Sequence, residues 1–260
     1  MTKGRLILFP VPIGAEKIGM SLPAANQELL ASCHTFIVEE LRTARRFLKK
    51  AGYPYPIGDC DRRGANPEKG DCDRRGANPE KDTVFLELNE HTTHEEIGHY
   101  LDAIERGENI GLLSEAGLPC VADPGAMITR VAQRRGIEVV PLVGPSSLML
   151  ALMASGFNGQ NFAFNGYLPV DKSKRAAAIR HLEERLHREH QTQLFIEAPY
   201  RNNQMLEALA STLNPQTMIC VACDLTLPTQ YIRSLSAAKW QKEREKLNLH
   251  KRNTVFLIGE

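Results

Sequence analysis

Short apolar runs alternate with helical patterns through the first half of the chain. Strand-like runs cover residues 5–9, 35–38, 84–88, 110–114 and 138–142. Helical patterns lie between them: residues 21–32, opened by Ser21 with Pro23 in the first turn; the basic stretch 41–50; a segment that begins at a Thr93–Glu96 capping-box pattern and ends near Arg106; and a segment after Pro124. Strands that alternate with helices predict parallel βαβ units here.

The second half has a different pattern. Its strand-like runs are 162–168, 193–198, 218–225, 230–235 and 254–259, and its helical patterns are 173–190, 200–213 and 236–246. Two strands follow each other between 218 and 235 without a helix, which predicts antiparallel pairing and a mixed sheet. We therefore expect an N-terminal α/β domain over residues 1–143 and a C-terminal α/β domain over 144–260, with the boundary near Gly144 and Pro145.

A twelve-residue unit, GDCDRRGANPEK, occurs at 58–69 and again unchanged at 70–81. Two polar copies without an apolar face do not make a solenoid. The unit predicts a mobile surface loop. It either contacts a polyanion through its arginines or is a solvated insert without function.

Composition narrows the class of protein. Hydrophobic residues make up 42% and charged residues 24%, as in globular proteins. No apolar run approaches the roughly 20 residues of a membrane span, and the N-terminal run reads as a first strand, so we expect a cytoplasmic protein that does not bind membranes. The net charge is +1, but residues 144–260 carry +4 and the remainder −3. This weakly favours the second half as the part that meets a polyanion.

One cysteine pair has the spacing of metal ligands. Cys220 and Cys223 lie inside the apolar run MICVAC, and no second such pair accompanies them. A buried strand explains them better than a zinc site. We therefore predict no metal.

Turns rich in small residues follow the predicted strands. They are Pro10–Gly14, Ser114–Pro119 with Ala122–Gly125, and Val143–Ser147. Ligands of open α/β sheets bind at the carboxyl ends of strands, and glycine and proline there allow close approach of a fixed backbone. The sequence has no GxGxxG, Walker or HExxH motif. The three turns together predict one binding pocket.

Several blocks resemble a known family. LLSEAGLPCVADPG (112–125), PLVGPSS (141–147), FNGYLP (164–169) and EAPYR (197–201) are similar to the signature blocks of the tetrapyrrole (corrin/porphyrin) methylase class of S-adenosylmethionine-dependent methyltransferases. FPVPIG (9–14) and EELRTARRFL (39–48) resemble its ribosomal RNA small subunit methyltransferase I branch, which 2′-O-methylates a cytidine of 16S rRNA. The likeness covers nearly the whole chain outside 58–81.

The resemblance implies a two-lobed α/β fold, with a mostly parallel N-terminal sheet and a mixed C-terminal sheet. It also implies a homodimer, 16S rRNA or the small ribosomal subunit as partner, and S-adenosylmethionine in the cleft between the lobes. By motif position, the cofactor-binding residues are Pro12, Ala116, Gly117, Leu118, Val121, Ser146, Ser147, Glu197, Ala198 and Leu225.

Catalytic roles follow from the chemistry of methyl transfer to a ribose hydroxyl. A base helps to remove the hydroxyl proton, and we expect Glu115 or Glu197 to accept it. Arg42 and Arg201 would bind phosphate as bidentate donors. Lys172, Lys174 and Arg175 are either a second RNA-backbone contact or a solvated helix start.

The blocks expected to face the acceptor depart from the family pattern more than the cofactor loops do. Glu39-Glu40-Leu41-Arg42 replaces Glu-Asp-Thr-Arg, and Glu197-Ala-Pro-Tyr-Arg201 replaces Glu-Ser-Pro-His-Arg. Methylation of a tetrapyrrole-like small molecule and non-catalytic binding of S-adenosylmethionine therefore stay open as alternatives.

Overall fold

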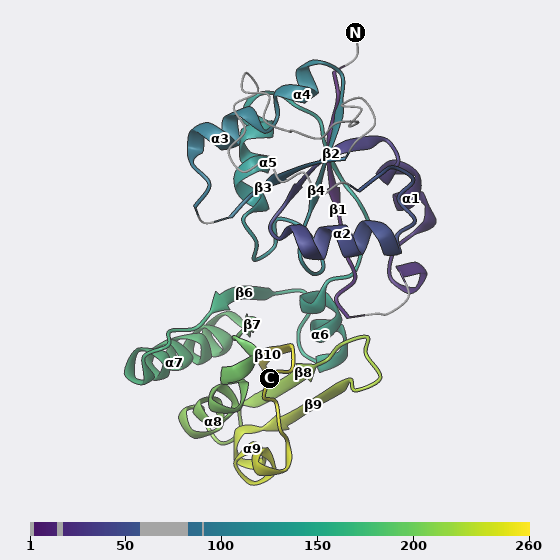
Figure 1. Ribbon diagram of the computed structural model, residues 1–260. Coiled ribbons are helices and arrows are strands. Elements are labelled where there is room, and N and C mark those ends of the chain that lie inside the picture. The colour runs from purple at the N-terminus through teal and green to yellow at the C-terminus, as the bar shows by residue number, and fades with distance from the viewer. Residues whose placement is uncertain (1–2, 15–17, 58–82, 90) are drawn as a thin grey trace. The chain divides into compact units, whose positions relative to one another are not determined.

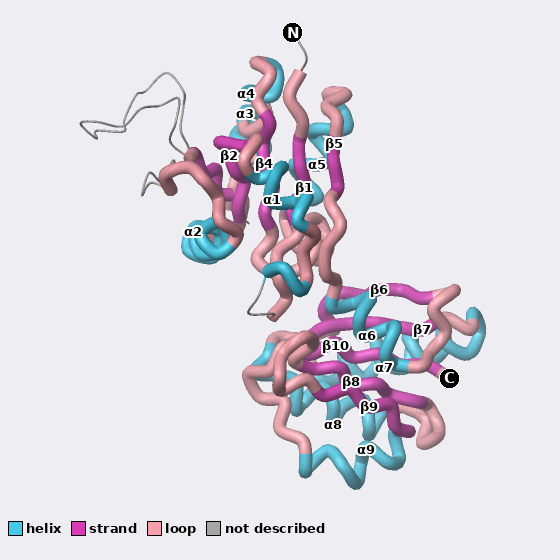
Figure 2. Tube along the Cα trace, turned by 90° about the vertical axis from the view of Figure 1, so that its right-hand side faces the viewer, coloured by secondary structure: helices cyan, strands magenta, loops and turns pink. Residues whose placement is uncertain are grey.

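The chain forms two compact units, each built on its own five-stranded sheet. A computed structural model describes residues 3–14, 18–57, 83–89 and 91–260 (Figure 1). Unit 1 is Met1–Pro145 and unit 2 is Ser146–Glu260. The duplicated segment 58–81 lies outside the described residues. Figure 2 shows the strands of each sheet side by side.

Unit 1 has a parallel sheet in the order β3-β2-β4-β1-β5, which confirms the predicted βαβ pattern. Its apolar strand runs suit a sheet that is covered on both faces. The described elements are β1 (Leu6–Phe9), the 3₁₀ helix η1 (Ile18–Met20), α1 (Ala24–Leu30), β2 (Cys33–Val38), α2 (Leu41–Lys50), β3 (Val84–Glu87), α3 (His94–His99), α4 (Asp102–Glu105), β4 (Asn109–Leu113), α5 (Gly125–Arg134) and β5 (Val139–Pro141).

Helices cover both faces of this sheet (Figure 1). Leu30 of α1 and Phe47 of α2 belong to the core on one face, together with Phe36 of β2. Ile97 of α3 and Ile128 of α5 belong to the core on the other face. Connections therefore leave the sheet toward opposite faces, as in doubly wound α/β folds.

The order of the strands creates a switch point between β1 and β4. These two strands are neighbours, yet β1 connects through α1 to β2 on one side, whereas β4 connects through α5 to β5 on the other. Ligands of open α/β sheets bind outside the carboxyl ends of strands at such a point. The loops after β1 and β4 are therefore the expected ligand-binding loops of unit 1.

Helix starts agree only partly with the sequence prediction. The capping box of Thr93 and Glu96 is present. In contrast, α1 begins at Ala24 after Pro23, because the Ser21 hydroxyl bonds to the Ile18 carbonyl within the preceding 3₁₀ turn rather than capping the helix. The segment predicted as one helix up to Arg106 is divided at Tyr100 and Leu101 into α3 and α4.

Unit 2 has a mixed sheet in the order β6-β7-β10-β8-β9, as predicted. β6 and β7 pair in parallel, while β10 pairs antiparallel with β7 and β8, and β8 pairs antiparallel with β9. Its elements are α6 (Ser147–Ser155), β6 (Phe162–Tyr167), α7 (Lys172–Glu189), β7 (Thr192–Ile196), η2 (Pro199–Arg201), α8 (Asn202–Thr212), β8 (Met218–Cys223), β9 (Tyr231–Ser236), α9 (Ala237–Glu243), η3 (Arg244–Lys246) and β10 (Thr254–Gly259).

The core of unit 2 lies between this sheet and helices α7, α8 and α9. Trp240 is fully buried there and donates its indole N–H to the Ile219 carbonyl at 2.9 Å. Cys220 and Cys223 are buried in β8, as the pattern predicted, and burial raises the pKa of the Cys223 thiol to about 11.

In the described part of the chain, no group of His, Cys, Asp and Glu is arranged to hold a metal ion. Likewise, no described helix has the length and apolar character needed to span a bilayer.

Candidate functional site

The loops after β1 and β4 are joined by backbone hydrogen bonds. The Val11 N–H donates to the Gly117 carbonyl at 2.9 Å, and the Gly117 N–H donates back to the Val11 carbonyl at 3.1 Å. Gly117 has a φ of +77°, a conformation that side chains disfavour. A Cβ at this position would lie 3.1 Å from Ile13 Cγ2. The pairing therefore brings together two of the three turns expected to form the pocket.

The turn after β5 meets the same place. A Cβ on Gly117 would lie 3.4 Å from the Pro145 carbonyl oxygen, and one on Gly144 would lie 2.1 Å from Pro10 Cβ. The buried Asn26 side chain also donates to the Val143 carbonyl at 3.0 Å. All three turns of unit 1 therefore converge at the carboxyl edge of the sheet.

Gly144 offers a test of this convergence. Gly144→Ala should lower the free energy of unfolding by about 2 kcal/mol, because the new methyl group overlaps the rigid Pro10 ring. Chemical denaturation measures the loss. Gly159→Ala is the control, since no atom of the described part of the chain lies within 4 Å of a Cβ there. Equal stability of the two variants would contradict the close contact between the turns.

The loop from Ser114 to Gly125 has a strained backbone. Cys120 and Ala122 have φ values of +68° and +61°, each costing on the order of 1–2 kcal/mol for a residue with a side chain. The Ser114 hydroxyl holds the loop by donating to the Gly117 carbonyl at 3.0 Å. Such strain concentrates at functional sites.

The predicted cofactor residues of this loop remain accessible to a ligand. Ala116 and Val121 are exposed, and Leu118 is half-buried. Pro12, on the loop after β1, is also half-buried. The converging turns thus present apolar side chains and backbone groups to solvent.

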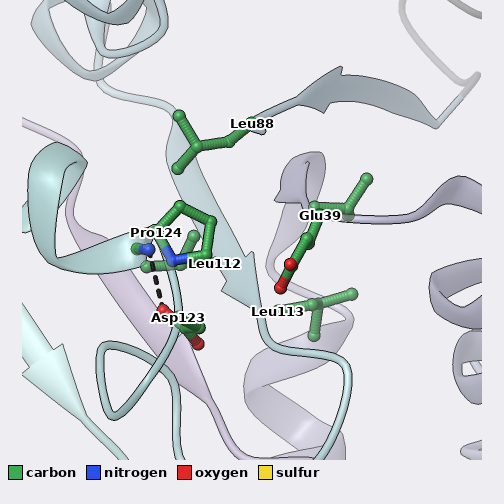
Figure 3. Close-up of a pocket in the computed structure, with 8 residues that line it drawn as sticks. Glu39, Leu88, Leu112, Leu113, Asp123 and Pro124 are labelled. Carbon is green, nitrogen blue, oxygen red and sulfur yellow. Dashed lines mark hydrogen bonds between the residues drawn. The ribbon is translucent and has the colours of Figure 1, made fainter. Parts of the chain in front are cut away.

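A small pocket lies at the carboxyl ends of β2 and β4, where α5 begins (Figure 3). Glu39 and Asp123 line it, with Leu88, Leu113 and Pro124 among their neighbours. Asp123 Oδ1 accepts hydrogen bonds from the backbone N–H groups of Cys120 (2.8 Å) and Gly125 (2.7 Å). The carboxylate therefore fixes the strained loop to the start of α5.

The pKa values of both carboxyl groups are raised. Burial raises the pKa of Glu39, and the negative charges of Glu115 and Asp123 raise it further. Burial also raises the pKa of Asp123, against the effect of its two backbone hydrogen bonds. Glu115, a predicted proton acceptor, thus interacts electrostatically with Glu39 and shares an acidic environment with it.

The raised pKa of Glu39 predicts a pH-dependent stability. The folded state holds this proton to higher pH than the unfolded state, so ionisation of Glu39 destabilises the fold as pH rises above the ordinary carboxyl value. Glu39→Gln should therefore increase the free energy of unfolding at pH 7 relative to wild type, and have a smaller effect at pH 4. Denaturant titrations at the two pH values measure the difference.

Glu40 is the matched control because its pKa changes in the opposite direction. Slight burial acts to raise the pKa, but hydrogen bonds from the Thr43 hydroxyl and from the N–H groups of Arg42 and Thr43 lower it overall. Glu40 caps α2, so Glu40→Gln should destabilise at pH 7 and do so less at low pH. The same sign for Glu39 and Glu40 would contradict the acidic environment of Glu39.

Unit 2 holds a second group of predicted site residues, at the carboxyl end of β7. The Glu197 side chain is fully buried, and its Oε1 accepts from Arg201 Nη2 at 2.6 Å and from the Ala198 N–H at 2.7 Å. Glu197 Oε2 is buried, and no residue in the described ranges hydrogen-bonds to it. A buried carboxylate oxygen without a donor suits a ligand that supplies one.

Arg201 is held from a second side as well. Its guanidinium lies over the Tyr200 ring, 5.1 Å from the centroid, and Nη1 donates to the Tyr200 hydroxyl at 3.1 Å. The Glu197 carboxylate raises the pKa of Arg201. Arg201 is thus a fixed cation that orients Glu197.

The other predicted cofactor-binding residues of unit 2 lie at two different places. Ser146 caps α6 by accepting from the Met149 N–H at 3.4 Å, and Ser147 is the first residue of that helix. Leu225 is buried between Asp224 and Thr226, which have φ values of +51° and +70°. The Asp224 carboxylate, held by Arg252 Nε at 2.7 Å, fixes this turn.

The structure thus groups the predicted residues within each unit. In unit 1, Pro12 and Gly117 lie on paired loops that also carry Glu115 and Ala116, and Arg42 is exposed in the first turn of α2. In unit 2, Glu197, Ala198 and Arg201 form one hydrogen-bonded group. The assignment of these residues to cofactor or catalysis stays a prediction.

Glu39 and Asp123 are site residues that the sequence reasoning missed. Both belong to blocks already noticed: Glu39 follows the end of β2, and Asp123 lies in the loop from β4 to α5, two residues before the helix. Their position at the carboxyl edge was the available signal. The partial burial of both side chains and the effect of the Asp123 charge on the pKa of Glu39 depend on the fold, and no pattern in the sequence encodes them.

Comparison with known proteins assigns the chain to a family. The family of tetrapyrrole (corrin/porphyrin) methylases matches residues 20–239. The chain belongs to this family. The resemblance noted from the sequence blocks is therefore confirmed.

Curated relatives are named ribosomal RNA small subunit methyltransferase I. The protein of Pseudomonas aeruginosa is 33% identical over 158 residues, covering 61% of this chain and 55% of its own length. That of Xylella fastidiosa is 29% identical over 225 residues, covering 86% and 70%. That of Bacillus subtilis is 36% identical over 146 residues, covering 56% and 48%. The chain spans about half the length of the first and third of these relatives.

Solved structures with the same fold are named as methyltransferases. The methyltransferase CobJ superposes with a TM-score of 0.60 at 16% identity, covering 99% of this chain and 94% of its own. Uroporphyrin-III C-methyltransferase from Thermus thermophilus, complexed with S-adenosylhomocysteine, gives 0.52 at 15% identity, covering 99% and 98%. These matches confirm the predicted two-sheet α/β fold.

Proposed function

We propose that the chain is an S-adenosylmethionine-dependent methyltransferase that 2′-O-methylates a ribose of small-subunit ribosomal RNA. The backbone pairing of Val11 with Gly117 carries the proposal, because it places two ligand-type loops at the switch point of the sheet. Membership of a methylase family supplies the reaction class. The names of the curated relatives favour rRNA as the acceptor.

The residues present fit the cofactor. Gly117 is buried with both its N–H and C=O bonded within the paired loops, and its missing side chain lets Ile13 and Pro145 pack close, so the exposed neighbours Ala116 and Val121 are the groups that a nucleoside can approach. Ala116, Leu118 and Val121 offer accessible apolar surface for an adenine ring. Unit 2, taken by itself, offers a ligand hydroxyl or amine the Glu197 Oε2 atom, which has no hydrogen-bond partner among the described residues. Backbone donors at the start of α6, next to Ser146 and Ser147, suit a carboxylate.

Bound S-adenosylmethionine supplies an electrophilic methyl group on a sulfonium. The protein has to hold the ribose hydroxyl in line and exclude water. We assign proton acceptance to Glu115, because its carboxylate is exposed on the Gly117 loop. Glu197, buried and bonded to Arg201, instead binds the ligand. Arg42 pairs with a phosphate of the acceptor strand.

The proposal includes the partners that the family resemblance implies. They are a second copy of the chain and the small ribosomal subunit, which places the reaction in the cytoplasm. Sedimentation equilibrium of the purified protein tests the dimer. A monomer at every concentration would remove that part of the proposal.

Nucleotide-resolution mapping of 2′-O-methylation tests the acceptor. We expect one ribose of the small-subunit rRNA to lose its methyl group in a strain without the gene, and to regain it when purified protein and S-adenosylmethionine are added to the unmethylated subunits. An unchanged map would overturn the rRNA assignment. Binding of S-adenosylmethionine with an unchanged map would favour a small-molecule acceptor.

A further inference from the structure

Four exposed basic side chains share one face of α2. They are Arg42, Arg46, Lys49 and Lys50. At about 100° per residue they fall within an arc of about 100°. Ala44, Phe47 and Leu48 are buried on the other side and fix the helix to the core of unit 1. We call these four cations the α2 basic face.

Only Arg42 of this face has an acidic neighbour at the helix, the N-cap Glu40, whose pKa its charge helps to lower; Arg46, Lys49 and Lys50 have none within α2. No acidic residue lies within α2, and among the ion pairs between described residues none includes these four cations. α7 is different, because its Arg185 and Arg188 both pair with Glu189. A solvated helix typically has such interleaved charges. The α2 basic face concentrates one sign.

The position of α2 links this face to the candidate site. The helix starts two residues after Glu39, which lines the pocket at the carboxyl edge of the sheet. From Arg42 at that end, the face extends about 12 Å to Lys50, at 1.5 Å per residue. Arg45 lies against the Phe85 ring, with its guanidinium 5.7 Å from the centroid, which further fixes the helix. A chain bound along the face would lead toward the site.

We propose that the α2 basic face binds the phosphate backbone of the RNA substrate. This inference rests on the proposed function and specifies which surface receives the acceptor. Duplex nucleic acid carries roughly one negative charge per 1.7 Å of axis, so a 12 Å row of cations meets several phosphates. The net charges of the two halves favoured the second half as the part that meets a polyanion. They did so because acidic residues elsewhere in the first half outweigh the local cluster of cations on α2.

Charge reversal on α2 tests the proposal against a matched helix. Arg46→Glu/Lys50→Glu changes two exposed cations four residues apart. The control, Arg130→Glu/Arg134→Glu, makes the same change at the same spacing on α5, which covers the opposite face of the sheet. Both pairs lie at solvent-exposed positions, so both variants should fold. Arg46→Gln/Lys50→Gln is the milder variant if the reversal lowers the thermal midpoint.

The readout is affinity for a short RNA duplex and for purified small ribosomal subunits, measured over a range of salt concentrations. We expect the α2 variant to bind both at least about 10-fold more weakly, with the salt slope reduced by about 2. The α5 variant should stay within about 2-fold of wild type. Methylation of small subunits at limiting concentration should fall with the affinity, while calorimetric binding of S-adenosylmethionine stays unchanged.

Three results would overturn the inference. The first is an equal loss of RNA affinity in the α2 and α5 variants, and the second is unchanged RNA affinity in the α2 variant. The third is an α2 variant that binds phosphatidylserine vesicles more weakly than wild type but binds RNA as well as wild type. The experiment also distinguishes a failure of this inference from a failure of the proposed function. Wild-type protein that binds RNA through α2 but methylates no small-subunit ribose would support the surface and reject the proposed acceptor.

Discussion

Arg201→Ala should lower the free energy of unfolding by about 3 kcal/mol, because it leaves the Glu197 carboxylate buried without its cation. The Glu197 side chain has no exposed surface, and Arg201 has only 20%. A loss of this size corresponds to a decrease in the thermal midpoint of about 6–12 °C. Binding of S-adenosylmethionine should weaken as well, since Arg201 holds the oxygen to which the Ala198 N–H also donates.

Two further variants show whether the buried pair is the cause. Arg188→Ala removes an exposed arginine that pairs with Glu189 in the same unit, and it should leave the free energy of unfolding close to wild type because solvent screens the pair. Adding Glu197→Ala to Arg201→Ala should cost less than the sum of the single changes, because the unpaired charge is then gone. Equal losses for Arg201→Ala and Arg188→Ala would contradict the pair.

Glu115→Gln should slow methyl transfer by about 100-fold, because glutamine cannot accept the proton of the ribose hydroxyl. Glu115 is exposed, so the fold and the affinity for S-adenosylmethionine should stay close to wild type. Single-turnover methylation of unmethylated small subunits measures the chemical step.

Glu138→Gln is the control for Glu115, because it removes another exposed carboxylate of unit 1, next to the amino end of β5 and away from the carboxyl edge. It should leave the rate unchanged. A rate for Glu115→Gln within about 3-fold of wild type would reject Glu115 as the proton acceptor, and Glu39 would be the next residue to test.

The sequence predicted the strands well because both sheets are buried. Continuous apolar runs such as residues 110–114 become central strands, and the missing helix between 218 and 235 becomes an antiparallel pair. Helix ends were less predictable. Nothing in the pattern signals the break at Tyr100, and the turn chemistry around Ser21 competes with capping.

The sequence predicted the parts of the candidate site that backbone turns form. It did not predict the parts that depend on which side chains surround a residue. Gly117 and Gly144 are visible as small residues after strands, and the structure gives them close contacts. The acidic environment of Glu39 and the orphaned Glu197 Oε2 depend on which side chains the fold buries together. Those features require tertiary structure.

A crystal structure with S-adenosylhomocysteine tests the central claim most directly. We predict that the nucleoside contacts the backbone of the Gly117 loop and the turn that contains Pro12. Density for the ligand at any other place, with these paired loops free of it, would contradict the account.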